Sequence, residues 1–119
     1  MRWLDQGAAA LILLVGLAHV AAASAVFGEP TERRVWFLSA GLFGITAGLV
    51  NLARARSGGS VLLRLAALSG SAGLVLMGAL LCASGGELGA QAAVVLAIGL
   101  LSAGFGLRDL FRPAGRRAR

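Results

Sequence analysis

The sequence predicts an all-α fold, a four-helix transmembrane bundle. The 119-residue chain is 58% hydrophobic with a mean hydropathy of +0.85, and four apolar stretches make up most of it. Crossing a hydrocarbon core of ~30 Å takes about 20 helical residues. Each stretch is apolar on all sides, which predicts helices and not alternating barrel strands. We expect one transmembrane domain over residues 1–119, with spans at 7–27, 35–53, 61–83 and 88–107 and a basic tail at 108–119.

The charges predict how these spans are oriented. All 11 basic residues are arginines, and only Arg33 and Arg34 lie in the first connection. The third connection carries only Glu87. Because cytoplasmic segments hold the excess of basic residues, both termini and the Ala53–Leu65 connection are predicted to be cytoplasmic. The remaining nine arginines then share that side: Arg2, Arg54, Arg56, Arg64, Arg108, Arg112, Arg116, Arg117 and Arg119.

The same composition indicates location and partners. Arginine without lysine, together with abundant Ala and Gly, is typical of a GC-rich bacterial genome, so we expect a multi-pass protein of the bacterial inner membrane. The net charge of +6 follows the predicted topology, so we expect contact with lipid headgroups and no nucleic-acid partner. Aromatic residues also prefer the membrane boundary. Trp3 and Phe111 are predicted interface anchors on the cytoplasmic side, and Trp36 is one on the outer side.

The two halves of the chain resemble each other at an offset of 58 positions. The clearest match is the pattern Gly-Leu-x-[Asn/Asp]-Leu-x-Arg, which begins at Gly48 and again at Gly106. It pairs Asn51 with Asp109. This similarity predicts two tandem two-helix hairpins, related by a pseudo-twofold axis along the membrane normal.

Small residues recur at three- and four-residue spacing along several spans. Glycine in a membrane helix lets a neighbouring backbone approach closely. These faces predict a bundle core or a homo-oligomer interface, and a ligand groove is the alternative. The predicted helix-packing positions are Gly41, Gly44, Gly48, Asn51, Gly73, Gly99, Ser102 and Gly106.

His19 is the one ionisable residue that the predicted spans place near the midplane. Burying an ionisable group in the membrane costs free energy, so such a residue points to a function. A neutral imidazole can also be structural, with its N–H donating a hydrogen bond to a backbone carbonyl. A structural role, a ligand or proton role and an oligomer contact all stay open. If a ligand binds, we expect it beside His19, Gly44 and Met77.

Cofactors and catalysis are not expected. The repeat places Met77 opposite His19, but methionine at helical spacing is usually core packing, so we do not predict haem. The single His and single Cys predict no metal site. A small proton-coupled exporter needs a membrane-embedded carboxylate, and the five acids all fall at predicted boundaries or in loops. His19 has no partner acid for catalysis, so the chain is not expected to be an enzyme.

One resemblance extends over the first half of the chain. His19, followed by Trp36-Phe37-x-x-x-Gly41-Leu42 and Gly48-x-x-Asn51-Leu52, resembles a group of uncharacterised small four-span bacterial membrane proteins. The resemblance implies fold and location but no activity.

The leading hypothesis is a non-catalytic structural or accessory subunit of a membrane assembly or a homo-oligomer. The small-residue faces and the lack of a catalytic set motivate it. The alternative is a binder or carrier of a small hydrophobic ligand, such as a lipid or quinone, that uses His19. A channel or transporter ranks below both, because no ring of charge lies within the predicted spans.

Overall fold

The computed structural model describes residues 2–26, 28–29, 31–57, 60–84 and 89–111. These residues form four α-helices: α1 (Arg2–Val26), α2 (Glu32–Ser57), α3 (Val61–Ala83) and α4 (Gly89–Leu110). All four are long and apolar enough to cross a membrane, and no strand occurs in the described part of the chain. The predicted four-helix transmembrane bundle is therefore confirmed, and the chain is a multi-pass integral membrane protein. The predicted tail 112–119 and residues 85–88 lie outside the described residues.

Hydroxyl side chains mark where two of the helices begin. Thr31 Oγ1 accepts a hydrogen bond from the Arg34 backbone N–H at 3.3 Å, and Ser60 Oγ accepts one from the Leu63 N–H at 3.3 Å. Each cap satisfies one of the N–H groups that have no partner within the first helical turn. At the other end, α2 continues to Ser57, beyond the apolar stretch that ends at Ala53. Arg54 and Arg56 are therefore helical.

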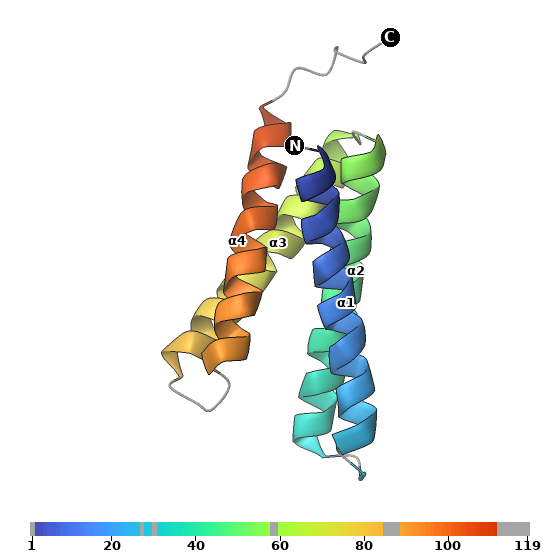
Figure 1. The fold of residues 1–119 in the computed structure, drawn as a ribbon, viewed down its shortest axis with the longest axis vertical. Helices are drawn as coiled ribbons and strands as arrows, with labels where there is room; N and C mark the ends of the chain where they lie inside the picture. The colour runs from blue at the N-terminus through green and yellow to red at the C-terminus, as the bar shows by residue number, and fades with distance from the viewer. Residues whose placement is uncertain (1, 27, 30, 58–59, 85–88, 112–119) are drawn as a thin grey trace.

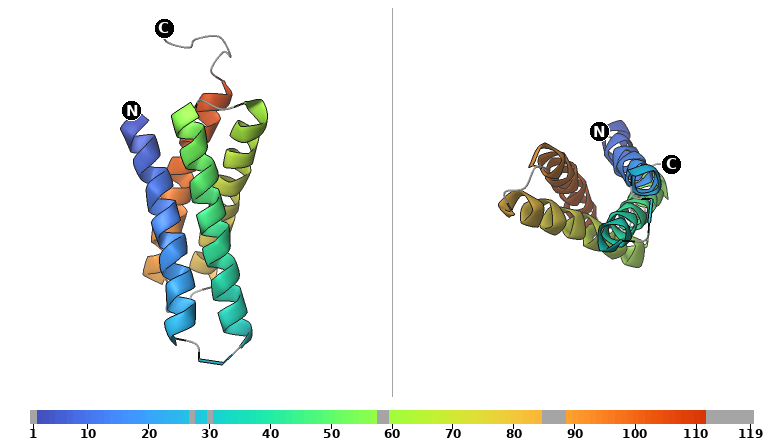
Figure 2. Two further views of the ribbon diagram at one scale, coloured as in Figure 1. Left: turned by 90° about the vertical axis from the view of Figure 1, so that its right-hand side faces the viewer. Right: turned by 90° about the horizontal axis from the view of Figure 1, so that it is seen from below.

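The four helices form two antiparallel hairpins, α1–α2 and α3–α4 (Figure 1). The hairpins lie against each other at the end where α1 begins and α4 ends, and they diverge toward the end that holds the α1–α2 and α3–α4 connections (Figures 1 and 2). The start of α1, the end of α2, the start of α3 and the end of α4 lie together at the closed end (Figure 1). The bundle is therefore a wedge, closed at one end and open at the other.

Glycines set the close packing inside each hairpin. A Cβ on Gly48 would lie 2.7 Å from the Leu13 backbone nitrogen, and one on Gly41 would lie 2.9 Å from the Gly16 carbonyl oxygen. In the second hairpin, a Cβ on Gly99 would lie 3.0 Å from the Val75 backbone nitrogen. Gly41 and Gly99 are equivalent in the sequence repeat, and they occupy the helix–helix contact of their respective hairpins. This pair has close backbone approach at matching positions, whereas a Cβ on Gly106, the equivalent of Gly48, would come no closer than 3.4 Å to Leu68.

The two hairpins meet around small and branched apolar side chains. A hydrophobic core joins all four helices through four buried residues: Ile12, Ala47, Leu74 and Ile98. A Cβ on Gly70 of α3 would lie 3.2 Å from Ala47 Cβ on α2, and one on Gly73 would lie 2.6 Å from the Phe43 ring. These contacts seat α3 directly against α2 and place the core midway along the helices.

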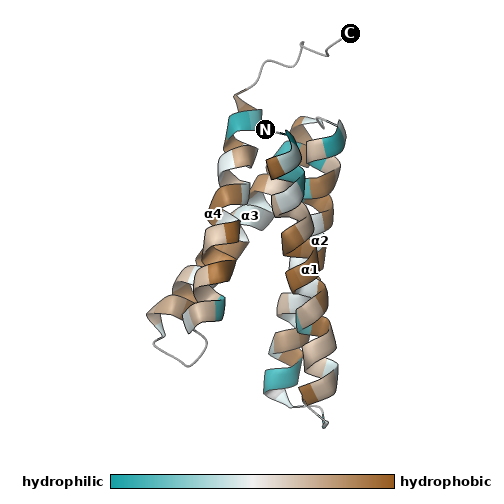
Figure 3. Cartoon of the chain, in the orientation of Figure 1, coloured by the Kyte–Doolittle hydropathy of each residue, from teal (hydrophilic) through white to brown (hydrophobic). Residues whose placement is uncertain are grey.

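Apolar residues predominate along the middle of the helices, while hydrophilic residues gather toward the helix ends (Figure 3). Many leucines and valines are exposed, as expected of side chains that face lipid. Trp3, Trp36 and Phe111 are 71%, 69% and 84% exposed. The first and last lie at the closed end and Trp36 at the open end, which are the positions that interface anchors require.

We predict that Gly48→Leu destabilises the first hairpin, because any side chain there collides with the backbone of α1. Overpacking of this kind costs about 1–3 kcal/mol or more. The free energy of unfolding, measured by titration with SDS in mixed micelles, tests this. Gly104→Leu is the matched control, since a Cβ at Gly104 meets nothing within 4 Å. Equal stability of the two variants would contradict the packing described here.

Candidate functional site

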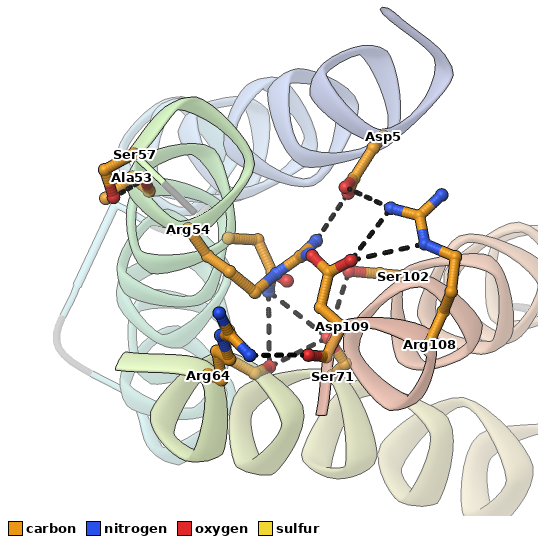
Figure 4. A network of polar contacts seen from close by, with 11 residues as sticks. Asp5, Ala53, Arg54, Ser57, Arg64, Ser71, Ser102, Arg108 and Asp109 are labelled. Carbon is orange, nitrogen blue, oxygen red and sulfur yellow. Dashed lines mark hydrogen bonds and ion pairs between the residues drawn. The ribbon is translucent and has the colours of Figure 1, made fainter. Parts of the chain in front are cut away.

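Polar side chains inside the bundle gather at its closed end. Arg54 of α2 has a side chain with 0% exposure, and it forms ion pairs with Asp5 of α1 and Asp109 of α4. One guanidinium nitrogen reaches each carboxylate, Nη2 to Asp5 Oδ1 and Nη1 to Asp109 Oδ2. Figure 4 shows the guanidinium between the two acids. Charge-assisted hydrogen bonds of this kind are the strong ones in proteins, and here they join three helices.

A second arginine closes this arrangement into a ring. Arg108 Nη2 lies 3.0 Å from Asp109 Oδ1 and 3.4 Å from Asp5 Oδ2. We call the four residues Asp5, Arg54, Asp109 and Arg108 the charge ring, because positive and negative groups alternate around it. Their formal charges sum to zero. Arg64 connects the fourth helix, α3, to the charge ring, because its Nη1 donates a hydrogen bond to the Asp109 backbone carbonyl oxygen at 2.8 Å.

Two charges near the predicted boundary turn into the bundle. Arg54 was expected in the Ala53–Leu65 connection, but α2 extends to Ser57 and Arg54 is completely buried. Asp5 lies in the first turn of α1, at the end of the span as predicted, and it is 3% exposed, which the sequence did not predict. His19 is therefore not the main ionisable group inside the bundle.

A neutral polar layer lies next to the ring, toward the middle of the bundle. Asn51 Nδ2 donates to the Ala67 carbonyl oxygen at 3.4 Å and to Ser71 Oγ at 3.2 Å. Ser71 Oγ lies 3.0 Å from Ser102 Oγ, so the layer links α2, α3 and α4. Asn51 Oδ1 and Arg54 Nε are buried without a partner among the described residues. Asn51 and Ser102, two predicted packing positions, thus contribute hydrogen bonds to the helix interface.

One sequence signal marks this polar end of the bundle. The repeated pattern Gly-Leu-x-[Asn/Asp]-Leu-x-Arg includes Asn51, Arg54 and Asp109, all of which turn inward. A polar residue repeated inside an otherwise apolar pattern indicates a buried partner. Asp5 lies outside the pattern, because its equivalent in the repeat is Leu63, and so do Arg64, Ser71 and Ser102.

An apolar cleft occupies the open end of the wedge, between the two hairpins. It has a volume of about 900 Å³, and all four helices line it. Its floor is formed by Ile12, Leu74 and Ile98, which also belong to the hydrophobic core. Polar side chains appear nearer its mouth, namely His19, Arg33, Ser84 and Gln91.

His19, Gly44 and Met77, the predicted ligand-binding residues, all line the cleft. Gly73 and Trp36 line it as well, although the sequence assigned them to helix packing and interface anchoring. The His19 ring stacks on Phe37 of α2, with centroids 5.1 Å apart and planes 23° apart. Its Nδ1 lies 3.0 Å from the Val15 carbonyl oxygen. Arg33 precedes Phe37 by one helical turn, so both lie on the face of α2 that borders the cleft.

The other predicted packing glycines lie away from the cleft. Gly41 and Gly48 are buried at the α1–α2 contact, and Gly99 and Gly106 at the α3–α4 contact. Among the residues described, no group of three metal-binding side chains occurs. The bundle thus has two distinct regions, a charge ring that joins the hairpins at the closed end and an apolar cleft between them at the open end.

We predict that Arg54→Met destabilises the bundle by about 3–5 kcal/mol, because Asp5 and Asp109 each lose a buried ion pair and the ring is left with a net negative charge. Arg56→Met removes the same charge from an exposed position of α2 and serves as the control. Adding Asp5→Asn and Asp109→Asn to Arg54→Met should recover part of the loss. Unfolding by SDS measures all four proteins. Equal effects of the Arg54 and Arg56 substitutions would show that the ring contributes nothing to stability.

No known protein is similar enough to this chain to indicate what these two regions do. No protein-family model, no curated protein and no solved structure matches the chain.

Proposed function

We propose that this protein binds a single-chain, lipid-like amphiphile in the cleft between its hairpins, without catalysing a reaction on it. The observation that carries the proposal is the cleft itself, with an apolar floor and polar groups at the mouth. This is the ligand-binding alternative of the sequence analysis. The cleft favours it over the accessory-subunit hypothesis, which remains a prediction about partners.

The size and lining of the cleft support an apolar body for the ligand. Binding sites for small molecules typically measure 300–1,000 Å³, with mostly apolar walls and a few polar groups that fix orientation. The cleft falls in this range, at about 900 Å³. The apolar walls fit a hydrocarbon chain, and the small side chains of Gly44 and Gly73 leave room for it.

The polarity of the cleft supports an amphiphile oriented like a lipid of the outer leaflet. The mouth carries Arg33, His19 and Gln91 on three different helices, whereas the floor is aliphatic. With the termini in the cytoplasm, as the arginine distribution predicts, the mouth lies at the outer interface and the floor near the midplane. A lipid of that leaflet has its headgroup and its chain in the same order.

The surroundings of His19 support binding without catalysis. The contacts of its ring are the Phe37 ring and the Val15 carbonyl oxygen, and neither is a nucleophile or an acid. None of the cleft-lining residues that the structure describes is an aspartate or a glutamate. A nucleophile–base pair or an acid–base pair would be needed for hydrolysis or transfer.

We predict that Ala40→Phe abolishes ligand retention, because Ala40 lines the cleft and the added ring occupies its space. Ser39→Phe places the same ring on the exposed neighbouring position of α2 and is the matched control. The proteins are extracted gently, and the bound small molecules are identified and counted per chain by native mass spectrometry. We expect about one amphiphile per chain for the wild type and for Ser39→Phe.

Two outcomes of that measurement contradict the proposal. Equal retention in all three proteins would place the ligand outside the cleft. Release of the wild type with larger subunits and with no bound amphiphile would favour the accessory-subunit hypothesis instead.

A further inference from the structure

The hydrogen bonding of His19 narrows the chemical class of the ligand, an inference that rests on the proposed function. His19 Nδ1 lies 3.0 Å from the Val15 carbonyl oxygen, one turn earlier in α1. A carbonyl oxygen only accepts hydrogen bonds, so Nδ1 must carry the proton. In the uncharged imidazole the second nitrogen, Nε2, is then a lone-pair acceptor.

The position of the ring is fixed by two contacts. The Nδ1 hydrogen bond holds one edge against α1, and the stacking on Phe37 holds one face against α2. Nε2 occupies the edge of the ring away from the Val15 carbonyl, in a side chain that lines the cleft. It bonds no residue that the structure describes. The cleft therefore contains a preorganised hydrogen-bond acceptor in an apolar wall.

We propose that the bound amphiphile carries a hydroxyl group in its head and donates it to His19 Nε2. The class comprises long-chain alcohols, monoacylglycerols and hydroquinones, and it excludes the corresponding ethers, ketones and quinones. An acceptor-only oxygen would face the Nε2 lone pair and leave it unsatisfied. A site built for a hydrogen bond rejects the analogue that lacks it, because a polar group of the site stays unpaired.

The neighbours of His19 agree with a head that bears more than one oxygen. Arg33 lies one turn from Phe37 toward the start of α2, and it supplies hydrogen-bond donors at the mouth. Gln91 of α4 lines the opposite hairpin and offers both a donor and an acceptor. In this arrangement the ligand's hydroxyl group binds His19 on the inner side of the mouth, and the other oxygens of its head face Arg33 and Gln91.

Trp36 provides the readout for a test. The chain has two tryptophans, so Trp3→Phe leaves Trp36, at the cleft, as the only one. In that background, hexadecanol brominated on its chain and its methyl ether are titrated in nanodiscs of phosphatidylcholine, a lipid without a hydroxyl donor. Bromine quenches tryptophan fluorescence on contact. The same titration of Ala40→Phe measures quenching by probe that is merely dissolved in the bilayer.

We expect the alcohol to bind about tenfold more tightly than the ether, which corresponds to one hydrogen bond. In His19→Phe, which keeps an aromatic ring beside Phe37 but has no acceptor, the two probes should bind equally. Equal binding of alcohol and ether to the wild-type His19 protein, or a preference that survives His19→Phe, would overturn this inference while leaving ligand binding in the cleft intact. Quenching by neither probe beyond that of Ala40→Phe would overturn the proposed function itself.

Discussion

The fully buried guanidinium group of Arg54 lies where all four helices meet. The packing of the helices at this end depends on the groups that balance its charge. Removing Arg54 from water carries a large desolvation cost unless partners surround it. Asp5 and Asp109 supply these partners from α1 and α4, and Arg108 balances the second negative charge. The three helices must therefore converge at this end. Arg64 of α3 completes the convergence by bonding the backbone of α4.

The shape of the molecule follows from where attractive contacts lie. Within each hairpin, glycines allow backbone contact along much of the helix length, as at Gly16 and Gly48 in the first and Gly78 and Gly99 in the second. Between the hairpins, the polar bonds of the described residues lie at the closed end and in its neighbouring layer. Toward the other end, the facing side chains are apolar and leave a cleft. Dispersion alone drives association there, and a lipid chain competes on nearly equal terms with a helix.

The sequence was sufficient to predict the helices, because four apolar stretches in so short a chain leave few alternatives. It also drew attention to His19, Gly44 and Met77, which do lie on one cleft. The orientation in the membrane and the location in a bacterial inner membrane stay predictions.

What the sequence did not reveal was which boundary charges turn inward. Arg54 and Arg56 are two residues apart and look alike in sequence, yet one is buried and the other is exposed. The difference depends on the rotation of α2 about its axis, which is set by packing across the bundle and not by local composition. The volume of the cleft was equally hidden, since it depends on the angle between the hairpins. Only the repeated pattern around Asn51 and Asp109 indicated that part of the interior is polar.

The composition of the charge ring has a consequence for how the protein enters its membrane. The first hairpin brings Asp5 and Arg54, and the second brings Arg108 and Asp109, so each contributes one negative and one positive group. During synthesis the first hairpin emerges before the second exists. Arg54 can pair with Asp5 within this hairpin, so its charge is balanced before the second hairpin is made. Docking of the hairpins then adds the cross-pairs without changing the total charge. Each half of the molecule is in this sense a self-sufficient unit of membrane insertion.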